Sequence, residues 1–136
     1  MREIEFRGIS VTNGKFVYGD LIHALNGKVY INIKTISGGG TEFIQPIEVI
    51  ANTVGEFIGL KDRENNKIWE GDIISFPKSP IFERYEIRYS VNLVGFCLYD
   101  LVGDEEEQMF SDWQSSDMKV IGNIHEHKHL LGGANA

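Results

Sequence analysis

A chain of 136 residues, 42% hydrophobic and 11% aromatic, is long enough to bury a hydrophobic core, which excludes a disordered tract. The single cysteine, Cys97, excludes an intrachain disulfide and a multi-cysteine zinc site. The net charge of -7 comes from one segment, because residues 98–118 hold seven acidic residues and no lysine or arginine, whereas the remainder holds 13 of each sign. The first residues lack the apolar core of a signal peptide and no run reaches the ~18 apolar residues of a membrane helix, so we expect a protein of the cytoplasm.

The first fifty residues alternate apolar and polar side chains, many of them β-branched or aromatic, and this pattern predicts an antiparallel meander. The predicted strands are 3–11, 16–25, 29–34 and 42–50. Asn13-Gly14 and Asn26-Gly27 lie between strands and suit type I′ turns, in which both central residues have a positive φ. The glycine run at 38–40 predicts a loop between strands.

The second half continues the same pattern, with a hairpin of strands 56–60 and 67–74 and further predicted strands at 72–76, 83–91, 94–102 and 119–125. Helical signals are weak, and short turns are expected only at 110–117 and 125–131. We therefore predict an all-β or mainly β fold. Its antiparallel hairpins are expected to form a small barrel or two packed sheets, with at most one or two short helical turns.

Four stretches then stand in a specific order: MREIEFRG at 1–8, FVYGDL at 16–21, TVGEFIGLKDRENNKIWEGDII at 53–74 and VIGNIHE at 120–126. In this combination the chain resembles the YopX-like proteins of bacteriophages and prophages of Gram-positive bacteria. The resemblance implies one domain over residues 1–131, or two small β lobes, followed by a flexible tail at 132–136. It also implies a phage-encoded or prophage-encoded, largely β protein that acts in the cytoplasm of the bacterial host. It implies no biochemical activity.

Three acidic side chains, Asp62, Glu70 and Asp72, form a candidate polar turn site within residues 53–74. We interpret this stretch first as a hairpin, because Asn65 and Asn66 tolerate a left-handed φ and Gly71 permits a tight bend. The alternative is a small hydrolase or other enzyme, in which Glu70 and Asp72 act as paired carboxylates in acid–base catalysis.

The sequence HEHKH offers His125, His127 and His129 as candidate metal ligands, with Glu126 between them. On a strand all three would share one face, whereas on a helix only the first and last would. A metal-dependent enzyme would use them. Their place near the end of the chain instead favours adventitious binding, so we expect no cofactor.

Two further stretches favour structural roles. Cys97 lies in a strand that is apolar on both faces, which predicts a buried thiol with a raised pKa. Residues 84–89 mix arginine and tyrosine, but strand alternation separates the two, so the tyrosines are assigned to the core. A nucleic-acid-binding module is the second alternative function. This separation of arginine and tyrosine and the acidic net charge both disfavour it.

The acidic segment and a nearby tryptophan form a candidate partner-binding surface: Asp104, Glu105, Glu106, Glu107 and Trp113. This segment is either a solvated loop or a surface that attracts a basic protein. Weighing these features, we predict a non-enzymatic binding or interaction module without a membrane association. Exposed strand edges further predict a homo-oligomer.

Overall fold

The computed structural model describes residues 2–103, 106–110 and 114–131. Within these ranges the chain forms β-strands and single 3-10 turns and no α-helix, so the mainly β prediction is confirmed. The strands form antiparallel sheets whose order is open at both ends, which realises the two-sheet alternative and not the barrel. The described turns are η1 (Ala51–Thr53), η3 (Ser115–Asp117) and η4 (Lys128–Leu130), one more than the sequence predicted. The unexpected one is η1, which the Thr53 hydroxyl closes by donating to the Ile50 carbonyl at 2.6 Å.

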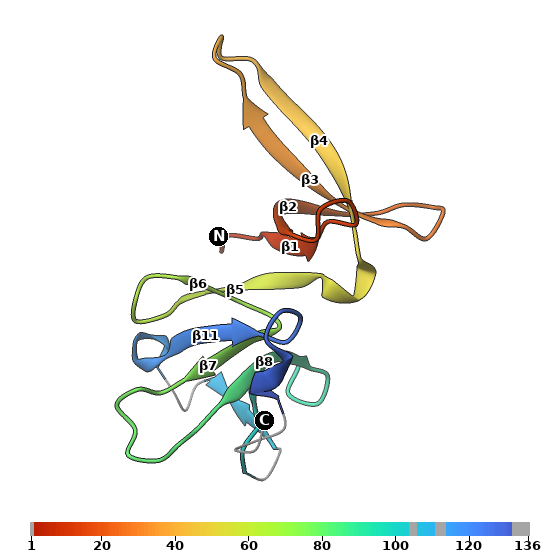
Figure 1. Cartoon of the computed structure of the whole chain (residues 1–136). Helices are drawn as coiled ribbons and strands as arrows, with labels where there is room; N and C mark the ends of the chain where they lie inside the picture. Colours follow the sequence, from red (N-terminus) through yellow and green to blue (C-terminus); the bar gives the residue numbers. More distant parts are fainter. Residues whose placement is uncertain (1, 104–105, 111–113, 132–136) are drawn as a thin grey trace. The chain divides into compact units, whose positions relative to one another are not determined.

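The chain divides into two compact units, Met1–Phe57 and Ile58–Ala136. The strands of the first unit are β1 (Phe6–Ile9), β2 (Phe16–His23), β3 (Val29–Ile36), β4 (Glu42–Val49) and the beginning of β5 (Gly55–Lys61). They are hydrogen-bonded in the order β4-β3-β2-β1-β5 (Figure 1).

Strand β2 changes partner halfway along its length. Its residues 16–19 pair with β1 and its residues 20–23 pair with β3. Gly19 lies at the change, where a Cβ atom would be 2.1 Å from the carbonyl oxygen of Asn32. Only glycine therefore allows β2 to approach β3 this closely.

The core of the first unit consists of Val29, Ile31 and Val49, with partly buried apolar side chains around them. Thr53, which is also buried, connects η1 to β1, because its hydroxyl oxygen accepts a hydrogen bond from the Ile9 amide at 2.9 Å. This buried cluster is small, so the backbone hydrogen bonds between strands contribute much of the stability of the first unit.

The type I′ prediction for the two Asn-Gly pairs is wrong. Gly14 and Gly27 have positive φ values of 71° and 86°, whereas Asn13 and Asn26 are not in the left-handed region. Each asparagine side chain instead accepts a hydrogen bond from the amide two residues on, at 3.0 Å and 2.9 Å. The loops are longer than the two residues of a type I′ hairpin, so one left-handed residue is enough to close each of them.

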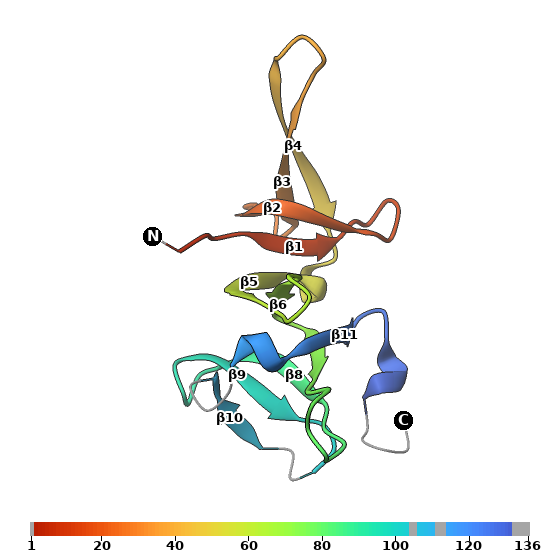
Figure 2. The ribbon, with the colours of Figure 1, turned by 90° about the vertical axis from the view of Figure 1, so that its left-hand side faces the viewer.

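The second unit contains the end of β5 and a separate five-stranded sheet. Its strands are β6 (Lys67–Trp69), β7 (Asp72–Ser75), β8 (Tyr85–Ser90), β9 (Gly95–Asp100), β10 (Glu107–Met109) and β11 (Lys119–Asn123). Strands β5 and β6 pair with each other, and the five-stranded sheet has the order β10-β9-β8-β7-β11 (Figure 2).

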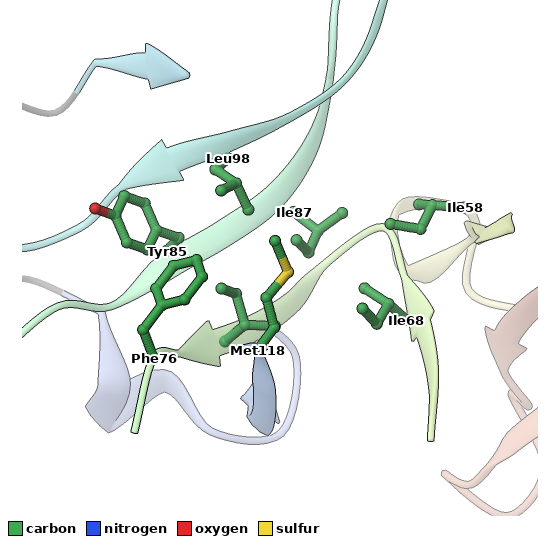
Figure 3. Packing of buried hydrophobic residues seen from close by; sticks show 8 residues of the cluster. Ile58, Ile68, Phe76, Tyr85, Ile87, Leu98 and Met118 are labelled. Carbon is green, nitrogen blue, oxygen red and sulfur yellow. The ribbon is translucent and has the colours of Figure 1, made fainter. Parts of the chain in front are cut away.

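A larger core holds the second unit together. Ile58 and Ile68 come from the β5–β6 hairpin, and they lie in one buried cluster with residues of the five-stranded sheet and Met118 (Figure 3). Phe76 and Tyr85 meet edge to face within this cluster, with their ring centroids 5.6 Å apart. The β5–β6 hairpin is thus one wall of this core, which explains why Ile68, Ile74, Ile87 and Leu98 are completely buried.

Candidate functional site

The distal half of the β3–β4 hairpin is a two-stranded ribbon that projects beyond β1 and β2 (Figures 1 and 2). The pairing of β2 with β3 ends at Asn32, whereas β3 and β4 remain paired as far as Ile36 and Glu42. Most side chains of this distal half are exposed, so among residues 2–57 no second layer covers it and the ladder between β3 and β4 holds it.

Large apolar side chains lie exposed on this ribbon. Ile36 is 74% exposed, Phe43 is 53% exposed and Ile44 is 60% exposed. Ile44 lies opposite Lys34 and Ile36 opposite Glu42, so the two isoleucines share one face, whereas Phe43 is on the other face opposite Thr35. We call Ile36, Phe43 and Ile44 the ribbon residues. Exposed apolar side chains on a projecting element are typical of a protein-binding surface.

Strand β4 also offers an open backbone edge. The Glu48 carbonyl accepts from the Val11 amide at 3.1 Å, and the Ile50 amide donates to the Ile9 carbonyl at 2.8 Å, so the groups of these even-numbered residues point away from β3. By strand alternation the backbone groups of Glu42, Ile44 and Pro46 point the same way. Residues 9–11 cover the edge only at Glu48 and beyond.

Asp62, from the predicted polar turn site, is a structural residue of the β5–β6 turn. One carboxylate oxygen accepts from the amides of Glu64 and Asn66, each at 2.9 Å, and the other accepts from the Val120 amide at 2.9 Å. Burial by itself would raise the pKa of Asp62, but these hydrogen bonds outweigh it, and the pKa lies below its ordinary value near 3.8. Asn65 has the predicted left-handed φ, at 66°.

Glu70 and Asp72 flank the bend at Gly71, whose φ is 88° as the hairpin interpretation requires. Asp72 is buried, and its carboxylate accepts from the Trp69 amide at 2.8 Å, which closes the bend between β6 and β7. Gly71 is fixed on both sides, since its amide donates to Ile87 and its carbonyl accepts from Ile124. The hydrogen bond from the Trp69 amide gives Asp72 a structural role, and the bend lies next to His125, whose Nε2 atom would be 3.5 Å from a Cβ atom on Gly71.

The predicted metal ligands follow β11 in a tight turn. Asn123 is its centre, because its side-chain oxygen accepts from the amides of His125 and Glu126 while its side-chain nitrogen donates to the Glu126 carboxylate. The Nδ1 atom of His127 accepts from the Asn123 amide at 3.1 Å. Within residues 2–103, 106–110 and 114–131 no three His, Cys, Asp or Glu side chains are grouped to hold a metal ion.

Of the predicted acidic surface, Asp104, Glu105 and Trp113 lie outside the described residues. Glu106 and Glu107 are exposed, and the Glu107 carboxylate accepts a hydrogen bond from the Ser90 hydroxyl. Recognition of a basic partner by this segment stays a prediction.

The two structural assignments made from the sequence can be compared with the fold. Cys97 is completely buried, and burial raises the pKa of its thiol, as predicted. Tyr85 and Ile87 are core residues, but Tyr89 is half exposed and packs edge to face on Phe96. Arg84, which strand alternation placed on the face opposite the tyrosines, is also buried, and its guanidinium carbon lies 5.2 Å from the centroid of the Phe82 ring.

Two surface hollows, of about 270 Å³ and about 360 Å³, are lined by other residues than the predicted carboxylates and histidines. The first lies beside Tyr18 and Lys34 and the second beside Phe76 and Phe82.

The sequence did not single out the ribbon residues. The available signal was that TEFIQPIEVI carries apolar residues on both strand faces directly after a glycine turn, which leaves one of those faces without a core.

These features define a small, mainly β protein in which Asp62 and Asp72 close turns and a projecting hairpin exposes apolar side chains. Residues 5–132 match the YopX protein family, so the chain belongs to that family. No curated protein sequence matches the chain. The fold is similar to that in the crystal structure of protein EF1440 from Enterococcus faecalis, with 22% identity, a TM-score of 0.59, and coverage of 96% of this chain and 99% of that one. No helix in the described part of the chain is long and apolar enough to cross a membrane.

Proposed function

We propose that this protein is a non-enzymatic binding module that holds a protein partner on the distal half of its β3–β4 hairpin. The observation that carries the proposal is the exposure of the ribbon residues on an element that projects from its unit. Covering each of these side chains would contribute on the order of 1 kcal/mol or more of binding free energy. The family membership supports an accessory role in a phage or prophage, exercised in the cytoplasm of a bacterial host.

The roles of the polar residues support a binding function over an enzymatic one. The carboxylates of Asp62 and Asp72 accept backbone hydrogen bonds that close turns, and Asn123 organises the histidine turn. A catalytic carboxylate needs access to substrate, whereas Asp62 is 5% exposed and Asp72 is 2% exposed.

The proposal is tested by photo-cross-linking from the hairpin. A benzophenone amino acid replaces Ile44 in one variant and Ile81 in a control variant, because both isoleucines are exposed and Ile81 lies in the other unit. In cells that produce the protein, we expect a protein adduct from position 44 and none from position 81. The proposal fails if position 44 gives no adduct, or if Ile36→Ser together with Phe43→Ser leaves the adduct unchanged.

A further inference from the structure

The open edge of β4 is short and has defined ends. Towards its C-terminal end, residues 9–11 occupy the backbone groups of Glu48 and Ile50. Towards its N-terminal end, the turn at 37–41 begins, where the Gly40 amide donates to Ser37. The outward backbone groups left between these ends belong to Glu42, Ile44 and Pro46, and Ile44 is at the centre.

A strand that pairs with this edge must accommodate Pro46, which has no amide N–H to donate. An antiparallel partner strand can do so if its residue opposite Pro46 donates its amide to the Pro46 carbonyl and requires no hydrogen bond in return. A second β4 strand does so when Ile44 lies opposite Ile44. The two Ile44 residues then exchange N–H···O=C hydrogen bonds, and the Glu42 amide of each chain donates to the Pro46 carbonyl of the other.

We propose that the occupant of the hairpin is a second copy of this chain, paired antiparallel along β4 with Ile44 opposite Ile44 around a twofold axis. This inference rests on the proposed function and names its partner. The side chains fit the pairing, because the exposed Ile44 side chains of the two copies become neighbours on one face. On the other face Phe43 lies opposite Gln45 of the second copy and diagonal to the second copy's Phe43.

The opposite edge of the ribbon is less suited to pairing. Beyond Asn32, β3 presents Lys34, whose ammonium group lies 3.4 Å from the Asp20 carboxylate. A lysine on an edge strand opposes the addition of another strand. The open stretch of β4 at 42–46 contains no lysine or arginine.

The mass of the full chain in solution tests this pairing. A strand segment this short forms a small interface, so we expect a mass that rises from one chain of 15.4 kDa towards two chains over about 1–500 μM. Ile44→Lys places two like charges side by side and should keep the protein at one chain throughout this range. Ile81→Lys, at an isoleucine of similar exposure, should leave the association unchanged. Circular dichroism verifies that both variants are folded.

A cysteine at the twofold axis reports the register. Ile44→Cys should form an interchain disulfide on mild oxidation faster than Phe43→Cys, and Cys97 does not compete because it is completely buried. Faster cross-linking from position 43 would overturn the proposed register. One chain at every concentration would overturn the self-pairing, and so would association that Ile44→Lys leaves intact.

The two proposals fail separately. If the protein remains a single chain while the benzophenone at position 44 captures a different protein, the binding module stands and the second copy is excluded. If the protein remains a single chain and position 44 captures nothing, both proposals are wrong.

Discussion

Replacing Asp62 by alanine should destabilise the second unit more than any other change of one turn residue. The substitution removes the acceptor for three backbone amides at 2.9 Å, those of Glu64, Asn66 and Val120. A hydrogen bond to a charged acceptor contributes about 1.5–3 kcal/mol, but water can replace it at the two amides of the turn. The half-buried Val120 amide bears the larger loss, so we expect a decrease of about 3–5 kcal/mol in the free energy of unfolding.

Urea unfolding followed by tryptophan fluorescence measures this loss, because Trp69 is buried in the same unit. Asp62→Asn keeps one carbonyl acceptor and should cost less, about 1–3 kcal/mol. The matched control is Glu64→Gln in the same turn, whose partner Lys119 lies 3.6 Å away in a half-exposed ion pair worth less than about 1 kcal/mol. A loss of less than about 1 kcal/mol for Asp62→Ala would refute the reasoning, since the carboxylate would then not hold β11 to the turn.

The pH dependence of stability gives an independent test of the same carboxylate. The folded-state pKa of Asp62 lies below the ordinary value near 3.8, so the unfolded chain binds the proton more tightly. The stability from Asp62 is therefore fully present above about pH 5 and is lost as pH falls through the lowered folded pKa. The stability difference between the wild type and Asp62→Asn should shrink over this acid range. A constant difference would contradict the lowered pKa.

Three further predictions concern Gly19, Tyr85 and Cys97. Gly19→Ala should lower the free energy of unfolding by about 3 kcal/mol or more, because the new Cβ would clash with the Asn32 carbonyl. Gly38→Ala is the control, because the Cβ there has open space around it and should cost little stability. Thermal unfolding measures both changes. Burial and the nearby Glu83 and Asp100 charges raise the pKa of Tyr85 to about 12, so stability should fall as pH rises from about 10 to 12, and Tyr85→Phe should remove this part of the fall. Cys97 should react with a thiol reagent at least ~100-fold more slowly in the native protein than in denaturant, because the thiol is buried. Reaction at equal rates would show that β9 opens readily.

The backbone conformation of a turn could be predicted from the sequence where one residue type favours a left-handed φ. Asn65 and Gly71 adopt the left-handed φ that their residue types favour. The Asn-Gly pairs were misassigned because the sequence does not fix the loop length, and the loop length decides whether the asparagine needs a positive φ.

The roles of the polar residues depended on partners that are distant in the chain. Asp62 accepts a hydrogen bond from the Val120 amide, 58 residues away, and this contact gives a residue of the candidate polar turn site a structural role. The histidines were predicted from spacing alone, but the hydrogen bonds of Asn123 decide how the turn that carries them is folded.

The sequence by itself determined that this is a mainly β protein, because alternation of apolar and polar residues depends only on the period of the strand. It also determined that Cys97 is internal, since its strand is apolar on both faces. Only the tertiary structure decided which apolar residues lack a covering layer, because Ile44 and Ile74 look alike in sequence while one is 60% exposed and the other is completely buried. Burial depends on what packs against a strand, and that is a property of the assembled sheets rather than of the strand.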